Sequence, residues 1–323
     1  MIDDYLLMNC EEFHIPVLVK EVMHLLNLKK GDIVFDGTLG GAGHTIVMTK
    51  AIAPTGKIIG VDLDSQAIST ATSKLKSLGL LKYVFVINDN FVNVVNILKK
   101  LGIEKLNAFL LDLGLSSIQI EKSGRGFSYL KNEKLDMRFN PLQKLSACNV
   151  VNEYTEDKLR EIFFKYGEEK WSGRIARNIV EHRKAKSVKY TSELVEIIRE
   201  SIPNSFKYRI KGHPAKRIFQ AVRIEVNSEL ENLEKVITEG LEVMEKGARM
   251  AVISYHSLED RIVKKKFEIY AGKCICPRGF PVCTCGAARL GRVLTKKVIR
   301  PESDEIKKNP RSKGAKLRVF EKL

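Results

Sequence analysis

The chain has 323 residues, of which 44% are hydrophobic and 29% charged, a balance typical of globular proteins with one large or two ordinary domains. No apolar run approaches the ~18 residues of a membrane-spanning helix. The start, Met1–Tyr5, lacks the basic flank and apolar core of a secretory signal. We therefore expect a cytoplasmic protein with no membrane partner.

The formal net charge of +16 is concentrated near the C-terminus. Residues 261–323 contain 18 Lys and Arg against 5 Asp and Glu, a net charge of +13. A basic segment of this size is typical of proteins that bind a polyanion, most often nucleic acid. A solubilising tail is the alternative. An anionic membrane surface is disfavoured because the segment lacks a long amphipathic apolar face.

The first predicted elements include a βαβ unit. A helix is expected over Pro16–Leu26, and the apolar run that follows ends on Asp36. A loop with four glycines, 37–44, leads into a helix, and a second apolar run ends on Asp62. Glycines let backbone N–H groups approach a ligand that a Cβ would exclude. A carboxylate about twenty residues further on can accept both hydroxyls of an adenosine ribose. The pattern predicts a nucleotide site.

The glycine loop also indicates which adenosine cofactor binds. A dinucleotide fingerprint needs G-x-G-x-x-G, and Gly41 and Gly43 supply only the first two glycines because Ile46 occupies the third position. The loop also lacks the Gly-Lys-Ser/Thr of a phosphate-binding P-loop. An adenosine cofactor without a pyrophosphate fits better, and we expect S-adenosylmethionine. A tight turn in an unrelated α/β domain is the alternative.

Alternation of strands and helices continues to about residue 112. Apolar segments at 84–87 and 109–112 flank a predicted helix over 94–101. Strands that are apolar along their whole length are typical of a parallel sheet with helices on both faces. Ligands bind such sheets at the loops that follow the carboxyl ends of the strands.

The alternation stops in the middle of the chain. No short apolar strand appears from 118 to 214, and helical patterns take over at 156–164, 173–183 and 191–200. A long helix is then expected from 215 to 246, before an apolar strand begins at Met250. We predict an α/β domain in two parts, 1–117 and 215–323, with an inserted helical domain at 118–214.

Two residues at predicted strand ends are candidates for the site. Phe91 can stack on a base, although an ordinary core aromatic would look the same. Asp112 can contact the methionine end of the cofactor or the incoming substrate amine, or it can cap the next helix.

A polar segment, Ser254–Arg261, follows the later strand. His256 beside Ser257 suggests a hydrolase, but no G-x-S-x-G motif occurs, which disfavours nucleophilic catalysis. Glu259 and Asp260 can stabilise the N-terminus of a helix.

Basic residues follow the His213-Pro214 dipeptide. Arg217 and Arg223 recur at helical spacing and would line one helix face, with Lys216 beside them. Such a face can bind the phosphates of RNA, and solvated surface charge is the alternative.

Four of the six cysteines are clustered: Cys274, Cys276, Cys283 and Cys285. The spacing C-x-C-x6-C-x-C, interrupted by proline and glycine, is typical of a hairpin. A reduced cytoplasmic chain would not use these residues as a disulfide framework. Four thiolates can hold a structural Zn²⁺, yet C-x-C pairs reach one ion less comfortably than C-x2-C pairs. A zinc site and a hairpin of free thiols both remain open.

Several short segments, taken in order, resemble those of one family: His14–Leu18, Asp36–Gly40, Asp112–Ser117, Arg125–Ser128, Leu135–Arg138, His213–Ala215, Phe219–Ile224, His256–Arg261 and Asn309–Ser312. The chain resembles, nearly end to end, the bacterial ribosomal RNA small subunit methyltransferase H family. That family transfers a methyl group from S-adenosylmethionine to the N4 amine of a decoding-centre cytidine, usually numbered 1402, of 16S rRNA.

The resemblance implies a Rossmann-like class I S-adenosylmethionine-dependent methyltransferase fold in which the helical insertion recognises RNA. It implies that the cofactor contacts are Ala42, Gly43, His44, Asp62, Phe91, Asp112 and Gln119, with Asp62 on the ribose and Phe91 beside the adenine. The chain departs from the family at Ile118, where proline is usual, and at Gly314, where a small hydroxyl residue is common. The implied partner is 16S rRNA in the small ribosomal subunit, and the sequence leaves a monomer and a homodimer both open.

An exocyclic cytosine amine is a poor nucleophile because its lone pair is delocalised into the ring. We expect polar acceptors near Asp112 to hold this amine in line with the methyl group, and Asp112 and His256 are the candidate catalytic residues beside it. A non-catalytic RNA-binding ribosome-assembly factor is the alternative, and it should not bind S-adenosylmethionine. A nicotinamide oxidoreductase would need a glycine in place of Ile46.

Overall fold

The computed structural model divides the chain into two compact units. Unit 1 comprises the residues up to Gly114 together with Leu230–Leu323, and unit 2 is Leu115–Glu229. The predicted insertion, 118–214, falls inside unit 2. The described residues are 16–121, 123–207, 212–274, 276, 279, 282, 284, 285 and 287–323. His14 and Ile15 of the first family motif therefore lie outside the described residues.

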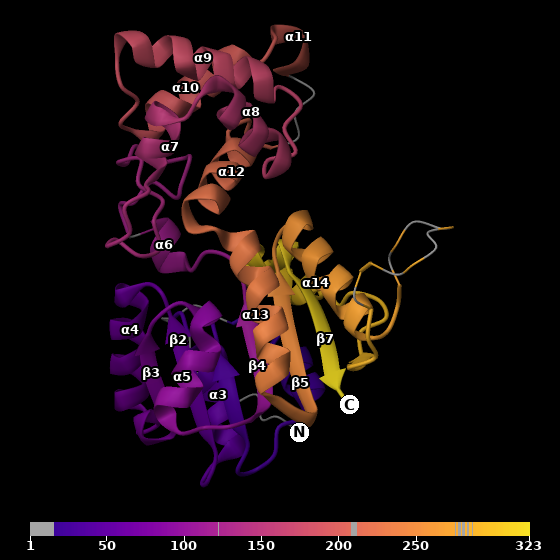
Figure 1. Cartoon of the computed structure of the whole chain (residues 1–323). Helices are drawn as coiled ribbons and strands as arrows, with labels where there is room; N and C mark the ends of the chain where they lie inside the picture. Colours follow the sequence, from indigo (N-terminus) through magenta and orange to yellow (C-terminus); the bar gives the residue numbers. More distant parts are fainter. Residues whose placement is uncertain are drawn as a thin grey trace. The chain divides into compact units, whose positions relative to one another are not determined.

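Unit 1 is built on a seven-stranded sheet in the order β3-β2-β1-β4-β5-β7-β6 (Figure 1). The strands are β1 Ile33–Asp36, β2 Lys57–Asp62, β3 Val84–Asn88, β4 Leu106–Asp112, β5 Met244–Ser254, β6 Gly291–Val293 and β7 Lys316–Lys322. The first five are parallel, and β7 runs antiparallel to β5 and β6. The direction of winding reverses between β1 and β4, which is where Rossmann-like sheets bind their ligands.

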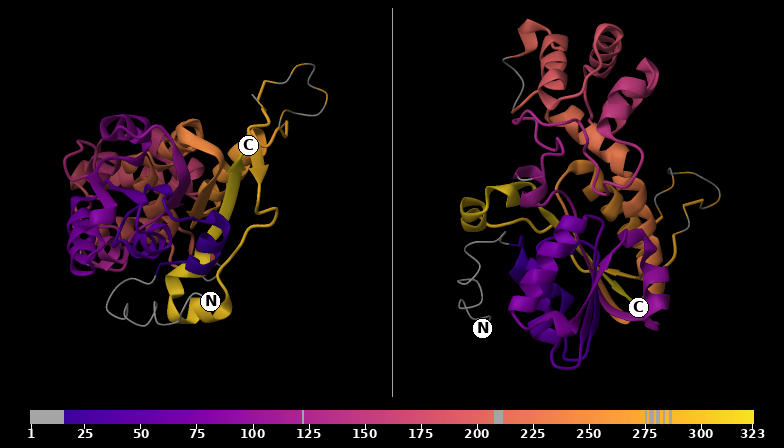
Figure 2. Two further views of the ribbon diagram at one scale, coloured as in Figure 1. Left: turned by 90° about the horizontal axis from the view of Figure 1, so that it is seen from below. Right: turned by 90° about the vertical axis from the view of Figure 1, so that its left-hand side faces the viewer.

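Alternate residues of each central strand enter two separate apolar cores, as the near-continuous apolar runs predict. Val34 and Leu110 point to one core, whereas Phe35 and Phe109 point to the other, with ring centroids 4.7 Å apart. The first core is covered by α2 Val19–Leu26, α3 Gly43–Ile52 and α4 Ser65–Ser77. The second is covered by α5 Val94–Leu101, α13 Glu229–Val243 and α14 Ser257–Tyr270. Figure 2 (right) shows helices on both sides of the sheet.

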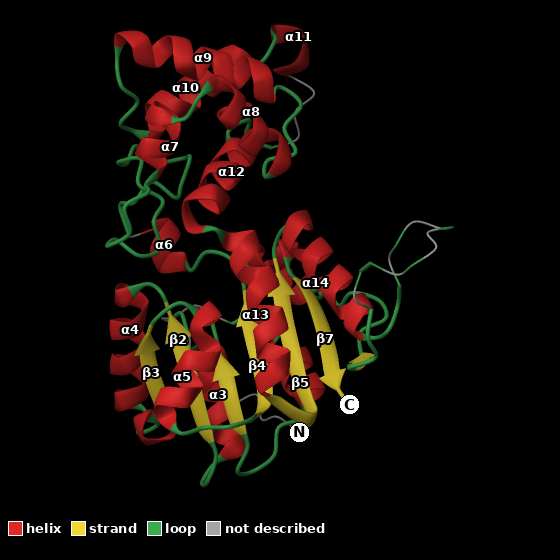
Figure 3. Ribbon diagram, in the orientation of Figure 1, coloured by secondary structure: helices red, strands yellow, loops and turns green. Residues whose placement is uncertain are grey.

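Unit 2 is helical, and no strand occurs among its described residues (Figure 3). Its helices are α6 Ser117–Glu121, α7 Ala147–Glu153, α8 Glu156–Lys165, α9 Ser172–Ala185, α10 Thr191–Ser201, α11 Asn204–Lys207 and α12 Lys216–Asn227. The predicted helices at 156–164, 173–183 and 191–200 are thereby confirmed as α8, α9 and α10.

The single long helix predicted from 215 to 246 is wrong. It is two helices, α12 and α13, separated by Ser228 in a left-handed backbone conformation with φ 49°. Asn227 explains the break, because its side-chain amide donates to the Met137 carbonyl and its Oδ1 accepts from the Phe139 N–H, both at 2.8 Å. These contacts hold the end of α12 on a distant loop of unit 2. The next strand, β5, begins at Met244 rather than Met250.

The shorter elements of unit 1 among the described residues are η1 Leu81–Tyr83, η2 Phe91–Asn93, α15 Ser303–Lys308 and η3 Pro310–Gly314. Among the described residues, no helix combines the length and the apolar character required to cross a membrane.

Candidate functional site

The glycine loop lies across the carboxyl ends of three neighbouring strands. The Gly37 N–H donates to the Leu110 carbonyl of β4 at 3.0 Å, and the Leu39 N–H donates to the Val61 carbonyl of β2 at 2.9 Å. A Cβ on Gly37 would lie 2.7 Å from Leu111 Cδ2 and 3.1 Å from Phe91 Cβ. Gly37 is therefore required because the loop packs against its own protein, which differs from the predicted reason of ligand approach.

Gly41 is in a different situation within the same loop. A Cβ built on Gly41 would meet no atom of the described residues within 4 Å. The next residue, Ala42, begins α3 with φ 60° and has no side chain that could cap the helix. The surface beside Gly41 is thus open at the start of a helix, and it is the part of the loop that can admit a ligand.

Asp62 ends β2 with its carboxylate turned toward the loop. Its Oδ2 accepts from the Gly40 N–H at 2.8 Å, and its Oδ1 accepts from the Asp64 N–H at 2.9 Å. An ionised carboxylate offers about four acceptor sites, so both oxygens can still accept a hydroxyl. Burial raises the pKa of Asp62 to about 6, and the group is charged at neutral pH.

Asp36, the last residue of β1, binds both the glycine loop and α3 through hydrogen bonds. Its side chain is buried and accepts from the Thr45 hydroxyl at 2.6 Å and from the Thr38 N–H at 3.2 Å. Burial raises its pKa. The acid that ends β1 thus ties the glycine loop to α3. This role was not predicted, although its position at a strand end was noted.

Asp112 is the centre of a group of three side chains. The Tyr255 hydroxyl donates to Asp112 Oδ1 at 2.9 Å, and His44 Nε2 lies 3.6 Å from Asp112 Oδ2. The Asp112 N–H donates to the Thr38 hydroxyl at 2.6 Å. Burial, the charge of Asp112 and the hydrogen bond to it raise the pKa of Tyr255 well above its ordinary value, so this hydroxyl remains a donor.

Tyr255 was missed as a site residue. The signal in the sequence is its place in the polar segment Ser254–Arg261, directly after an apolar strand. The structure pairs that strand, β5, with β4, so that Asp112 lies opposite Ile253. A polar side chain two residues beyond Ile253 falls at the same sheet edge. The Tyr255 ring also lies against Gly114, where a Cβ would be 3.0 Å from Tyr255 Cδ2.

His44, in the first turn of α3, carries an unsatisfied polar atom. Its side chain is 7% exposed, and Nε2 has no hydrogen-bond partner among the described residues. An unsatisfied buried nitrogen is costly. The Asp112 carboxylate, 3.6 Å away, is the charged group that faces this nitrogen.

His256 is held at the start of α14. Its Nδ1 accepts from the Glu259 N–H at 3.3 Å, while Glu259 Oε2 accepts from the N–H groups of Tyr255 at 2.8 Å and His256 at 3.2 Å. This is a reciprocal capping arrangement, so Glu259 stabilises the helix start as predicted. Asp260 also lies in the first turn of α14, and it pairs with Lys316 and Arg318. A catalytic role for His256 stays a prediction.

Three predicted cofactor contacts remain. Gly43 is the first residue of α3, and a Cβ there would lie 3.0 Å from Pro16 Cβ. The other two lie in different units. Phe91 begins η2, with its Cβ beside Gly37 in unit 1. Gln119 belongs to α6 of unit 2, where its Oε1 accepts from the Ser116 N–H at 3.0 Å. The side chain of Ile118, the noted departure from the family, lies outside the described residues.

Comparison with known proteins decides the family. Residues 11–323 match the MraW methylase family. The chain belongs to this family. The resemblance found in the sequence motifs is thereby confirmed, as are the class I methyltransferase fold and S-adenosylmethionine as the cofactor.

Curated relatives of this MraW methylase match over almost their full length. Ribosomal RNA small subunit methyltransferase H of Clostridium botulinum (strain Loch Maree / Type A3) is 46% identical over 310 residues, covering 96% of this chain and 99% of the relative. The protein of the same name from Clostridioides difficile (strain 630) is 45% identical over 314 residues, covering 97% and 100%. A crystal structure of an rRNA methylase from Streptococcus thermophilus aligns with a TM-score of 0.44 and 12% identity, covering 100% of this chain and 99% of that one. The description of the fold rests on the strand order of the sheet.

The predicted basic face of this methylase is only partly available. Lys216 and Arg217 are exposed at the start of α12. Arg223 is not: its guanidinium forms a bidentate pair with Glu229 at 2.8 and 2.9 Å, and its side chain is 13% exposed. Arg223 thus differs from Lys216 and Arg217 in that its charge is paired with Glu229, and RNA binding by Arg223 stays a prediction.

Proposed function

We propose that this methylase transfers a methyl group from S-adenosylmethionine to the N4 amine of a cytidine, usually numbered 1402, in the 16S rRNA of the small ribosomal subunit. The names of the curated relatives support ribosomal RNA of the small subunit as the substrate. The observation that carries the proposal is the Asp112 carboxylate, with one oxygen held by Tyr255 and the other facing His44.

The residues present fit the cofactor. Asp62 keeps acceptor sites for ribose hydroxyls, the loop is open beside Gly41, and His44 has an unsatisfied buried nitrogen. By the family resemblance, the cofactor contacts are Ala42, Gly43, His44, Asp62, Phe91, Asp112 and Gln119. Of these, Gln119 rests on the resemblance alone.

When bound, S-adenosylmethionine supplies an activated methyl group on its sulfonium. The task of the protein is then to place the amine in line and to increase its electron density. Asp112 can do both by accepting a hydrogen bond from the amine N–H through the oxygen that Tyr255 leaves available. Placement of this kind contributes up to about 7–11 kcal/mol to lowering a barrier. The proton lost after transfer can pass to the Asp112 carboxylate or to water.

RNA binding is assigned to basic side chains. Lys216 and Arg217 on α12 and the basic segment 261–323 supply phosphate contacts, which position RNA without reading its sequence. The target base must be unstacked to reach a carboxylate at a sheet edge, at a cost of a few kcal/mol.

The proposal is tested with labelled S-adenosylmethionine on small ribosomal subunits and on free 16S rRNA, followed by mapping of the labelled nucleotide. We expect label on the N4 of one cytidine, and a loss of roughly 10²–10⁴ in rate for Asp112→Asn. Asp157→Asn on α8 is the control, because that side chain is 86% exposed.

Two results would contradict the proposal. Label on a different atom or base would overturn the substrate assignment. Failure to bind S-adenosylmethionine in calorimetry, with RNA binding retained, would favour the non-catalytic assembly factor instead.

A further inference from the structure

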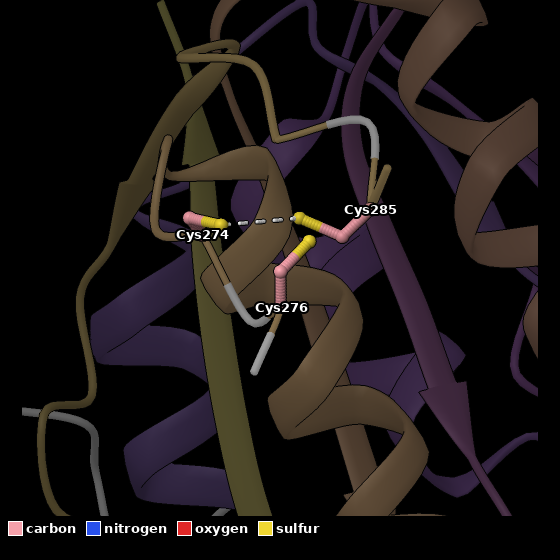
Figure 4. A group of neighbouring side chains, drawn as sticks. All are labelled: Cys274, Cys276 and Cys285. Atoms are coloured by element: carbon pink, nitrogen blue, oxygen red, sulfur yellow. Dashed lines mark hydrogen bonds between the residues drawn. The ribbon is translucent and has the colours of Figure 1, made fainter. Parts of the chain in front are cut away.

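Three cysteines of unit 1 converge in the segment between α14 and β6, outside the methyltransferase site. The sulfur atoms of Cys274, Cys276 and Cys285 all lie within 4.8 Å of one another. Figure 4 shows the three thiols turned toward a common point from the two sides of the hairpin. Cys283, the fourth thiol of the sequence motif, lies outside the described residues.

The separation between the sulfurs of Cys274 and Cys285 matches a shared metal ion better than a disulfide. Cys274 Sγ and Cys285 Sγ are 3.8 Å apart, whereas a disulfide needs about 2.05 Å. Zn–S bonds of about 2.3 Å in a tetrahedron place neighbouring sulfurs about 3.8 Å apart. The observed pair therefore has the spacing of two ligands on one tetrahedral ion.

The described part of the hairpin contains no buried residue that could form an apolar core. None of the residues described between Gly272 and Leu290 is buried, and Val282 is 67% exposed. Its two ends are nevertheless held together at the end of α14, where the Leu290 N–H donates to the Tyr270 carbonyl at 2.8 Å. Small segments without a core are usually stabilised by disulfides or by metal.

A backbone contact supports thiolate character at the cluster. The Thr284 N–H donates to Cys276 Sγ at 3.4 Å. Groups that donate to ligating atoms orient them and stabilise their charge. The surrounding segment 261–323 has a net charge of +13, which favours an anionic zinc–thiolate centre.

We propose that Cys274, Cys276 and Cys285 bind a structural Zn²⁺ ion that orders this hairpin. Each thiol releases its proton to solvent on binding, and no electron is transferred. Three sulfurs leave one tetrahedral position, which a water molecule can fill. Zn²⁺ suits an all-sulfur tetrahedral site because it has no redox chemistry and tolerates this geometry.

The test uses the full chain, produced in zinc-supplemented medium and purified without chelator. We expect about one zinc per chain by mass spectrometry, and thiolate-to-metal charge-transfer bands with intense tetrahedral d–d bands after replacement by Co²⁺. Cys274→Ser, Cys276→Ser and Cys285→Ser should each weaken metal retention at least about tenfold. Cys148→Ser in α7 of unit 2 is the matched control and should retain the ion.

A second measurement is independent of methyl transfer. Removal of the ion with a chelator should make the hairpin sensitive to trypsin near Lys273 and Arg289, while circular dichroism and binding of S-adenosylmethionine persist. Three results would overturn the proposal: absence of zinc and of cobalt–thiolate bands in the unmodified chain, retention of metal by all three serine variants, or a metal-free chain with a Cys274–Cys285 disulfide.

Discussion

At the scale of single residues, the Tyr255 hydroxyl is the least expected part of the site. Tyr255→Phe keeps the ring against Gly114 but removes the donor to Asp112. We expect kcat to fall roughly 10- to 100-fold, with the KM for S-adenosylmethionine nearly unchanged, because one hydrogen bond to a charged group contributes about 1.5–3 kcal/mol.

The matched control for Tyr255 is Tyr154→Phe, because Tyr154 donates to Glu225 at 2.9 Å inside unit 2. That change should lower stability without lowering kcat. Equal losses of activity in the two variants would show that the hydroxyl of Tyr255 has no specific role.

Asp62 predicts a pH dependence of cofactor binding. Its pKa, raised from 3.8 to about 6 by burial, means that its carboxylate gains a proton as the pH falls through 6, and the protonated group is a poorer acceptor for ribose hydroxyls. Affinity for S-adenosylmethionine should therefore fall up to about tenfold per pH unit below 6. Calorimetry from pH 5 to 8 measures this, and Asp62→Asn should abolish the dependence.

The raised pKa of Asp62 has the opposite effect on the free energy of unfolding, which it makes larger at low pH. A carboxyl whose pKa is higher in the folded state than in the unfolded chain favours folding when protonated. The contribution of Asp62 to stability without ligand is thus present at low pH and is lost as the pH rises from about 4 to about 6. A contribution that increased over this range would contradict the assignment.

At the scale of elements, two glycines of the loop between β1 and α3 have different roles. Gly37 is needed for packing of the loop, and Gly41 is the expected point of contact with the ligand. Gly37→Ala should lower the melting temperature, because its Cβ would lie 2.7 Å from Leu111 Cδ2. Gly41→Ala should leave the melting temperature within a few degrees, because its Cβ enters open space, but should weaken cofactor binding. Thermal denaturation and calorimetry on both variants test this. Unchanged binding in Gly41→Ala would place the cofactor elsewhere.

Helix α12 divides its basic residues between two roles. Lys216→Ala and Arg217→Ala should each weaken RNA binding and lower the slope of log affinity against log salt by about 1, because each removes one phosphate contact. Arg223→Ala should leave that slope unchanged and destabilise the fold by about 1.5–3 kcal/mol, because it removes the partner of Glu229. If Arg223→Ala lowered the slope of log affinity against log salt, Arg223 would be a phosphate contact after all.

At the scale of the whole molecule, one sheet is assembled from two distant stretches of chain. Strands β1 to β4 come before unit 2 and strands β5 to β7 after it. The local patterns predicted α5 and α8 closely because amphipathic spacing and caps act within a few residues. They did not predict the end of α12 at Asn227, because that end depends on Met137 and Phe139, about ninety residues away.

The sequence by itself determined the class of cofactor and the alternation of strands and helices up to about residue 112. The glycine loop and the acids that end its flanking strands lie close together in the sequence, so the cofactor site can be predicted from these residues without knowledge of the fold. Only the tertiary structure decided which side chains meet at Asp112, because Tyr255 is 143 positions away and reaches it through the pairing of β4 with β5. Tertiary packing likewise assigned Arg223 to an internal ion pair. Charge and spacing cannot reveal that a cation has a buried partner.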